Sequence, residues 1–363
     1  MWLIATAGSN PAATALGLEL FRVPKAPAGS GGGLLLSAHV LVAAGAASSQ
    51  APASGPLAAP SREEPQTSPR TLTADLLVLG WGKGGKTLAA SMAAAGRRVV
   101  MVEQSSLMYG GTCINIGCVP TKTLVHAADE RREGYDPQEH FDRAVDTRDA
   151  LIGKLNDVNL HMLADHDSVT IVDGRARFVG PREVEVKPSA GGAGPAEHLL
   201  ISAEGVFAMG DVHGHGQQTY LSLDDSRIVA SALTGDGSRR LSDRVAVPPT
   251  TFPTPPLSAV GLTEHEAREP GHEVRTVLAP VVGIKAMPRP KTLGDARGVT
   301  KVIVDAQSDL VLGARLFHVD SQEVVNLVAL AMRAGITATQ LRDGIWTHPS
   351  STEALNEVLG RLA

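Results

Sequence analysis

The chain has 363 residues, of which 43% are hydrophobic, so it can form two domains with sizeable cores. Its formal net charge of -5 and pI near 6.2 give no reason to expect nucleic acid or an anionic membrane surface as a partner. No apolar stretch reaches the roughly 18 residues of a membrane-spanning helix, since the longest candidate covers only residues 34–47.

Residues 1–72 differ in composition from the rest of the chain, being rich in Ala, Gly, Pro and Ser. We expect a low-complexity extension here, either disordered or created by a misassigned start. Two alternatives stay open. The apolar run at residues 34–46 is typical of a secretory segment, and the scarcity of acidic residues is typical of a transit peptide.

The ordered part is expected to begin at Thr73 with a strand–loop–helix–strand unit. Residues 74–80 form a short apolar run ending in glycine, which is typical of a buried parallel strand. Residues 86–96 have helical composition, and residues 98–103 predict a second strand. This βαβ start is the context in which a glycine loop binds phosphate.

The loop between the first strand and the helix carries Gly80, Gly82 and Gly85 in the pattern G-x-G-x-x-G. In a dinucleotide site these glycines allow a tight turn, close approach of a pyrophosphate, and packing of helix on strand. Glu103 ends the second strand and is placed to accept hydrogen bonds from an adenosine ribose. We therefore predict dinucleotide binding; the alternative is a merely glycine-rich turn.

The remaining pattern predicts an FAD-type domain at 73–246 and an α+β domain at 247–363, with the boundary in a proline-rich segment. The expected elements are a helix at 127–165, strands at 169–173, 184–187, 206–212, 299–305 and 311–317, and a helix at 321–334.

Cys113 and Cys118 are the only cysteines, and both lie in one glycine-flanked turn. A bridge across so short a loop adds little stability, which favours reversible redox chemistry over a structural disulfide. Residues five apart on a regular helix point away from each other, but the flanking glycines permit the distortion that a bridge needs. A helix N-terminus and Lys122 one turn later would stabilise a thiolate. Two unpaired buried thiols are the alternative.

Near the C-terminus, His348 and Glu353 form a possible acid–base pair, because a carboxylate can orient an imidazole and raise its basicity. The alternative is a helix start at residues 349–351 with Glu353 in its first turn.

Two further clusters carry a structural interpretation. His213 and His215 lack a ligand set that would complete a metal site, so we expect a solvated loop and no metal. Asp224 and Asp225 are expected to cap a helix or lie on an exposed face.

Together these motifs resemble the flavoprotein pyridine nucleotide–disulfide oxidoreductases, the family of dihydrolipoamide dehydrogenase, glutathione reductase and mercuric reductase. The resemblance covers about residues 73–363. Within the family, the segments at 82–89, 108–126, 219–229 and around His348 are most similar to the bacterial hypothiocyanous acid reductase branch, whose members resist reactive chlorine species.

The resemblance implies roles for individual residues. The glycine loop, Glu103, Gly111 and Thr112 would hold FAD, with its ribitol at Gly210 and Asp211. Cys118 would face the flavin, Cys113 would attack the substrate, and Lys122 would lie at the isoalloxazine. His348, supported by Glu353, would serve the opposite subunit of a homodimer.

One departure from the family pattern concerns the electron donor. The family places a nicotinamide-binding domain, with its own glycine fingerprint, before the Gly-Asp motif. Here residues 197–205 run almost directly into that motif, and neither a second fingerprint nor the usual Ala-Thr-Gly strand end is found. We expect this domain to be absent, which removes the family's route for hydride from NAD(P)H; an error in gene assignment stays open as an explanation.

The sequence thus predicts an enzyme, a flavoprotein oxidoreductase passing electrons between FAD, the Cys113/Cys118 dithiol and a small oxidant or disulfide. No extra C-terminal cysteine pair is present, unlike mercuric reductase and large thioredoxin reductases. The alternative is a non-catalytic FAD-binding or dimerising remnant without NAD(P)H reactivity. A redox-cycling dithiol suits the reducing cytoplasm, with an organelle or export as the alternative if residues 1–72 are a targeting segment.

Overall fold

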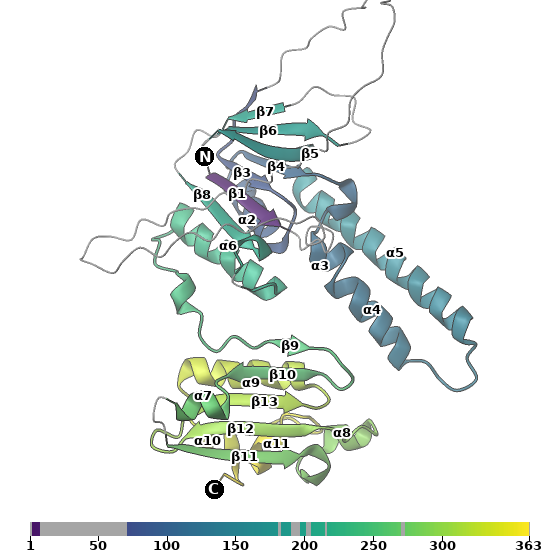
Figure 1. The fold of residues 1–363 in the computed structure, drawn as a ribbon, viewed down its shortest axis with the longest axis vertical. Coiled ribbons are helices and arrows are strands. Elements are labelled where there is room, and N and C mark those ends of the chain that lie inside the picture. Colours follow the sequence, from purple (N-terminus) through teal and green to yellow (C-terminus); the bar gives the residue numbers. More distant parts are fainter. Residues whose placement is uncertain are drawn as a thin grey trace, which may run out of the picture. The chain divides into compact units, whose positions relative to one another are not determined.

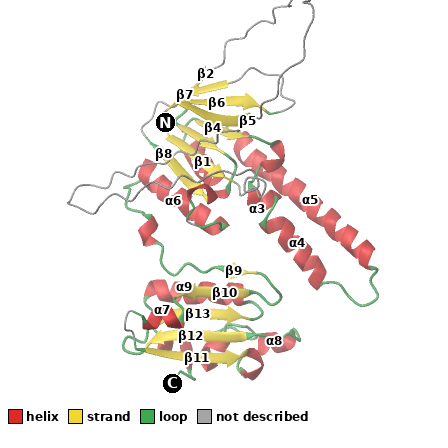
Figure 2. Cartoon of the chain, viewed as in Figure 1, coloured by secondary structure: helices red, strands yellow, loops and turns green. Residues whose placement is uncertain are grey.

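The computed structural model describes residues 2–7, 71–180, 183–189, 197–200, 205–214, 216–269 and 273–362. The chain divides into two compact units between Arg239 and Arg240 (Figures 1 and 2). Each unit is an assembly of helices on a sheet, so the fold class is α/β. Among the helices of these residues, none combines the length and apolar character needed to cross a bilayer.

An eight-stranded sheet in the order β2-β7-β6-β5-β4-β3-β1-β8 forms the first unit. Its strands are β1 (Trp2–Ala7), β2 (Thr71–Leu72), β3 (Leu76–Leu79), β4 (Val99–Glu103), β5 (Val169–Gly180), β6 (Glu183–Pro188), β7 (Glu197–Leu200) and β8 (Val206–Gly210). The long β5 pairs in parallel with β4 through its first half and antiparallel with β6 through its second half. It therefore joins the parallel nucleotide-binding part to a small antiparallel extension.

The central strands are buried on both faces. Alternating residues of β3 enter two different apolar clusters, with Leu76 and Val78 on the side of α2 and Leu77 on the side of β5 and β6. This burial explains the continuous apolar run in the sequence, because a strand covered on both faces has no polar side.

The helices of this unit follow the loops at the strand ends. They are α2 (Lys83–Ala94), η1 (Ser106–Met108), α3 (Thr112–Asn115), α4 (Cys118–Asp129), α5 (Pro137–Ala164), η2 (Asp211–His213) and α6 (Thr219–Thr234). The single helix expected at 127–165 is instead the end of α4 and the separate α5. Gly134 has a positive φ of 91°, Pro137 begins α5, and the Asp136 side chain accepts from the Glu139 N–H, so the local residues stop one helix and start another.

The strand β1 is an unexpected part of this sheet. It pairs in parallel with β3 on one side and with β8 on the other, and Ile4 lies opposite both Val78 and Phe207. We expected residues 1–72 to lie outside the folded domain. Residues 2–7 and 71–72 do not, because they form the strands β1 and β2 of this sheet. Local composition does not reveal this because both partners of β1 are remote in sequence. The segment from 8 to 70, with its candidate targeting run, lies outside the described residues.

A five-stranded antiparallel sheet in the order β11-β12-β13-β10-β9 forms the second unit. Its strands are β9 (Thr250–Thr251), β10 (Leu257–Gly261), β11 (Val274–Pro280), β12 (Val299–Asp305) and β13 (Val311–Phe317). Its helices are η3 (Leu241–Asp243), α7 (Glu264–Arg268), η4 (Val281–Gly283), α8 (Pro288–Thr292), α9 (Ser321–Ala334), α10 (Ala338–Arg342) and α11 (Ala354–Leu359). The expected strands at 299–305 and 311–317 and the helix at 321–334 coincide with β12, β13 and α9.

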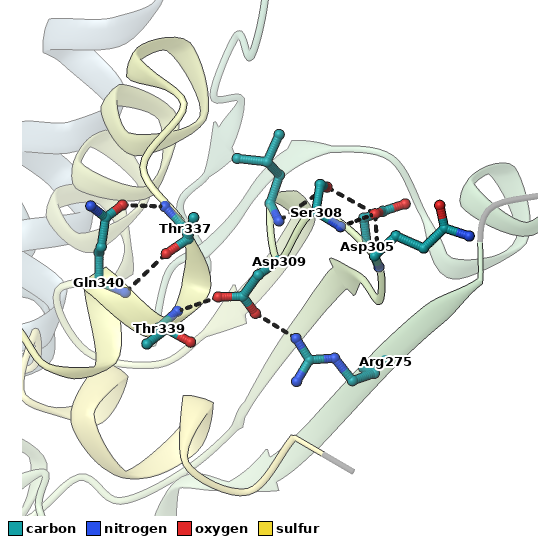
Figure 3. Close-up of polar contacts among 9 residues, drawn as sticks. Arg275, Asp305, Ser308, Asp309, Thr337, Thr339 and Gln340 are labelled. Atoms are coloured by element: carbon teal, nitrogen blue, oxygen red, sulfur yellow. Dashed lines mark hydrogen bonds and ion pairs between the residues drawn. The ribbon is translucent and has the colours of Figure 1, made fainter.

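Polar contacts hold the β12–β13 turn against β11 and α10 (Figure 3). Asp305 accepts from the Ser308 N–H at 2.7 Å and from the Ser308 hydroxyl at 2.8 Å. Asp309, at a φ of +59°, pairs with Arg275 and accepts from the Thr339 N–H at 2.9 Å. One aspartate thus joins three elements of this unit.

Candidate functional site

The glycine loop connects β3 to α2, as the sequence predicts. Gly80 has a φ of +92° and donates its N–H to the Val102 carbonyl at 2.8 Å, which makes the turn off the sheet. Gly82 is the N-cap of α2 and has an extended backbone. Because it has no side chain, it makes no side-chain capping hydrogen bond. The first turn of α2 therefore presents backbone N–H groups and contains no acidic residue. This is the arrangement that binds phosphate.

Glu103, at the end of β4, lies against this loop and is only 6% exposed. Its Oε2 accepts from the Trp81 N–H at 2.9 Å, and its Oε1 accepts from the N–H groups of Gln104 and Ser105. Burial raises the pKa of Glu103, while these three hydrogen bonds oppose that rise. The carboxylate thus fixes the backbone of the glycine loop at Trp81 and of the turn that follows β4.

The cysteine turn packs directly on the glycine loop. Gly111 has a φ of +75°, and a Cβ on it would lie 2.8 Å from Gly82 Cα and 3.1 Å from the Trp81 carbonyl oxygen. The Trp81 and Tyr109 rings contact each other beside it in a tilted arrangement, with centroids 4.6 Å apart and an interplanar angle of 55°. Next to Gly111, Thr112 Oγ1 is buried and, among the described residues, has no hydrogen-bond partner. The two predicted motifs therefore form one site.

Cys113 and Cys118 lie on two short helices rather than on one. Cys113 is the second residue of α3, Cys118 is the first residue of α4, and the backbone breaks at Ile116 and Gly117 between them. This break in the helix is the kind of distortion that two cysteines five residues apart need if their side chains are to face each other. Both cysteines are free thiols, Cys113 half-buried and Cys118 exposed.

The environment of Cys113 acts on its protonation in both directions. Burial raises the pKa of Cys113, and the neighbouring Cys118 raises it further, whereas hydrogen bonding by Thr219 and the charge of Lys86 lower it. Cys118 Sγ lies 3.7 Å from Thr219 Oγ1. Thr219 is the first residue of α6. No role was predicted for Thr219 from the sequence, although its position soon after the Gly-Asp strand end was a usable signal.

Gly210 and Asp211 lie at the end of β8 and are held by α6. Gly210, with a φ of +75°, donates its N–H to Asp225 Oδ2 at 2.7 Å, and the same oxygen lies 2.7 Å from His213 Nε2. Asp225 is 4% exposed. The expectation of an exposed or capping Asp225 and a solvated His213 is therefore wrong, because the strand end and α6 enclose both side chains; His215 lies outside the described residues.

Ser222, also on α6, joins the two halves of this site. Its hydroxyl accepts from the Gly84 N–H at 3.0 Å, and a Cβ on Gly84 would lie 2.7 Å from the Ser222 carbonyl oxygen. The glycines of α2 thus allow α6 to approach closely. No role was predicted for Ser222, although it lies in the segment 219–229 that carries part of the family resemblance.

In the second unit, His348 and Glu353 are hydrogen-bonded, with His348 Nδ1 2.9 Å from Glu353 Oε1. Glu353 Oε2 accepts from the Ser350 N–H at 2.8 Å, and α11 begins directly afterwards at Ala354. Glu353 is therefore the partner of His348 and the N-cap of α11. The alternative of a helix that starts at residues 349–351, with Glu353 in its first turn, is wrong because the helix begins only at Ala354. His348 itself is exposed.

Two remaining expectations concern charge and metals. Lys122 lies on α4, one turn after Cys118, and is exposed. Within the described ranges, His, Cys, Asp and Glu side chains form no group of three or more that could hold a metal ion.

Comparison with known proteins identifies both units. Residues 74–203 match the family described as pyridine nucleotide-disulphide oxidoreductase, and residues 247–359 match the dimerisation domain of that family. The chain is 31% identical to the probable pyridine nucleotide-disulfide oxidoreductase RclA of Escherichia coli, in an alignment that covers 78% of this chain and 98% of that protein. It is 32% identical to a mercuric reductase of Staphylococcus aureus over 44% of this chain and 28% of the relative.

Solved structures agree with these sequence matches. The HOCl-induced flavoprotein disulfide reductase RclA of Escherichia coli aligns with a TM-score of 0.70 and 29% identity, covering 81% of this chain and all of that chain. Its Cu(II) complex aligns with a TM-score of 0.71 and 27% identity over 81% of this chain and 99% of that chain. The chain therefore belongs to the pyridine nucleotide-disulfide oxidoreductases, a family of flavoprotein disulfide reductases.

Proposed function

We propose that this protein is an FAD-dependent disulfide oxidoreductase in which Cys113 and Cys118 exchange electrons with the flavin and with a small oxidant or disulfide. The observation that carries the proposal is the packing of the cysteine turn on the glycine loop at Gly111, with Thr219 of α6 against the sulfur atoms. A glycine loop of the phosphate-binding type next to a dithiol is the arrangement that a flavin-coupled redox pair needs. A purely structural role for the cysteines would not require it.

The residues present fit FAD. Lys83 and Lys86 both lie in the first helical residues of α2, where positive charge opposes the helix dipole and no acid offsets it. A bound pyrophosphate would remove that conflict. Among the described residues, the buried Thr112 Oγ1 has no hydrogen-bond partner, and Thr112 directly follows Gly111, which packs on the backbone of Gly82. FAD, when bound, would supply a two-electron carrier for the dithiol.

The chain's own residues carry the sulfur chemistry. As a thiolate, Cys113 attacks one sulfur of a disulfide substrate, forming a mixed disulfide and releasing one thiolate. Cys118 then attacks the Cys113 sulfur, releases the second thiolate and leaves a Cys113–Cys118 disulfide that two electrons return to the dithiol. Cys118 is exposed, and it would be the sulfur that faces a bound flavin, with Lys122 one turn later on α4 near the flavin ring.

His348 is proposed to protonate the leaving thiolates. Its bond to Glu353 through Nδ1 fixes the ring and leaves Nε2 as the reacting nitrogen. In the proposed homodimer this pair serves the opposite subunit. Support comes from the match to a dimerisation domain and from exposed apolar side chains on this unit, which include Leu278, Val282 and Ile345.

A second candidate function is a flavin-binding or dimerising remnant that does not react with NAD(P)H. The alignment with RclA supports this second candidate, because the alignment runs over 442 positions while this chain has 363 residues. The relative therefore contains a long segment with no counterpart here. We propose that this segment is the nicotinamide-binding domain. A redox-cycling dithiol is proposed to work in the cytoplasm.

The purified protein distinguishes these functions. For the oxidoreductase we expect FAD uptake with a flavin spectrum, and anaerobic dithionite titration that consumes two electrons for the flavin and two for the dithiol. The Cys118→Ser protein is the matched control, since it binds FAD but loses the second pair. A protein that takes up no FAD would contradict the oxidoreductase and a flavin-binding remnant, leaving only a dimerising one, and turnover with NADPH or NADH would contradict the remnant.

A further inference from the structure

The loop that carries His348 is exposed in its middle and anchored at both ends. The side chain of His348 is 71% exposed, so packing contributes little to its position. At the first end of the loop, Asn356 Nδ2 of α11 donates to the Arg342 carbonyl at 2.6 Å and to the Gly344 carbonyl at 2.9 Å. Hydrogen bonds at the base of the loop therefore have a large part in holding the imidazole.

The second end of the loop is anchored by Asp320, the residue before α9. Its Oδ2 accepts from the Ser351 hydroxyl at 3.0 Å, and Ser351 is only 3% exposed. The same oxygen accepts from Arg289 Nε of α8 at 3.2 Å, which gives the carboxylate a charged partner and fixes its direction. An oriented, charged acceptor therefore receives a buried hydroxyl at the base of the loop.

The anchored serine is adjacent to the contacts that orient His348. Ser350, directly before Ser351, donates its N–H to Glu353 Oε2 at 2.8 Å. Glu353 Oε1 lies 2.9 Å from His348 Nδ1. Because the peptide unit between Ser350 and Ser351 is rigid, movement of Ser351 also moves the N–H that Glu353 accepts. Asp320 therefore acts on the pair of His348 and Glu353 through the backbone of the two serines.

The backbone of Asp320 does not explain why an aspartate is present there. Its φ is +62° and its ψ is 15°, a left-handed conformation that glycine and asparagine also adopt. Its carbonyl accepts from the N–H groups of Glu323 and Val324 in the first turn of α9, but its side chain makes no capping hydrogen bond to that helix. The contacts of the carboxylate lead to Ser351 and Arg289 instead.

We propose that Asp320 is a positioning residue for His348. By accepting from Ser351 it holds the loop so that the imidazole stays hydrogen-bonded to Glu353. Because a carboxylate only accepts, the neutral imidazole in this pair carries its proton on Nδ1, which leaves Nε2 to take up or give a proton. The role of Asp320 in turnover rests on the proposed function of His348, but its effect on the imidazole does not.

The test reads the tautomer of His348 by NMR in the full-length protein labelled with 15N-histidine. Spectra are recorded at about pH 8.5, where ordinary imidazoles are neutral. The signals of His348 are assigned by their loss in His348→Gln. In the parent protein we expect the Nδ1–H form, because Glu353 accepts from that nitrogen.

Two substitutions at Asp320 separate its side chain from its backbone. Asp320→Gly tolerates the positive φ but has no acceptor for Ser351. In this variant we expect the ratio of the Nδ1–H form to the Nε2–H form to fall by about two- to tenfold, which is the equilibrium change that one ordinary hydrogen bond produces. Asp320→Asn tolerates the same φ and keeps a side-chain oxygen for Ser351, so we expect its ratio to stay close to that of the parent.

Two further variants separate positioning from general stability. Ser351→Ala removes the donor and should shift the tautomer ratio as Asp320→Gly does; it also carries the test if Asp320→Gly does not fold. Asp309→Gly is the matched control, because Asp309 also has a positive φ, +59°, and an ion pair with Arg275, but it holds the β12–β13 turn (Figure 3). We expect Asp309→Gly to lower the Tm and to leave the ratio at His348 unchanged.

A parent-like ratio in folded Asp320→Gly or Ser351→Ala would overturn the proposal, and so would a parent protein without the Nδ1–H form. Equal shifts in Asp320→Gly and Asp320→Asn would do the same, by showing that an acceptor for Ser351 does not hold the loop. A shift of the same size in Asp309→Gly would assign the effect to stability alone. Because the spectra need neither bound FAD nor turnover, these outcomes are independent of whether the proposed oxidoreductase activity is found.

Discussion

The substitution Ile4→Pro tests whether β1 pairs with both β3 and β8 in the sheet. Ile4 lies opposite Val78 on one side and Phe207 on the other, so the strand has a partner along both edges at this residue. Proline removes the N–H that one ladder needs and leaves its acceptor unsatisfied. The lost bond and the steric clash together cost about 3 kcal/mol. For a domain of this size that corresponds to a fall of about 6–12 °C in Tm.

Hydrogen exchange with mass spectrometry, together with thermal melting, measures this effect. In Ile4→Pro we expect faster amide exchange in β3 and β8, because they lose their shared neighbour. Ile4→Val is the matched control, since it keeps the N–H and a high strand propensity. Peptides from β12 and β13 in the second unit serve as an internal reference. If β3 and β8 exchange at the parent rate in a folded Ile4→Pro protein, β1 does not belong between them.

Three other substitutions test the site and the second unit. Gly111→Ala places a methyl group against the backbone of the glycine loop at a positive φ, so we expect at least tenfold weaker FAD retention, measured by flavin release during dialysis. Burial works to raise the pKa of Glu353, but the hydrogen bonds from His348 and Ser350 and the charge of His348 together outweigh it and hold this pKa below its ordinary value. The stability that Glu353→Gln loses at pH 7 should therefore vanish as the pH of the melting buffer falls through that lowered pKa. Asp309→Ala should cost about 2 kcal/mol in urea unfolding through loss of the pair with Arg275, and Asp309→Asn less.

Local patterns were sufficient for the elements whose partners are close in sequence. The hairpin of β12 and β13 and the helix α9 have the predicted bounds because apolar periodicity and the turn between them determine these elements locally. The βαβ start was predictable for the same reason. Its helix begins earlier than expected, at Lys83, because the second half of the glycine loop already has helical geometry.

Tertiary contacts account for what the sequence could not show. Asp225 reads as one of two adjacent exposed acids, yet its carboxylate receives the Gly210 N–H from a strand end 15 residues away. Lys86 belongs to no predicted site, but its side chain is buried and donates to Asn159 of α5, which lies 73 residues further along the chain. Both are buried charges whose partners are fixed only when distant elements pack.

The position of β1 also bears on the alternative of a targeting segment. Its last residue, Ala7, lies opposite Gly210, and Ala5 lies opposite Leu79, so β1 ends at the same edge of the sheet as the glycine loop and the Gly-Asp motif. In parallel sheets this carboxyl edge is where the nucleotide binds. Cleavage after the apolar run at residues 34–46 would remove β1 and leave β3 and β8 without their common partner. The sheet therefore places residues 2–7 between two strands that each lead into a predicted binding motif.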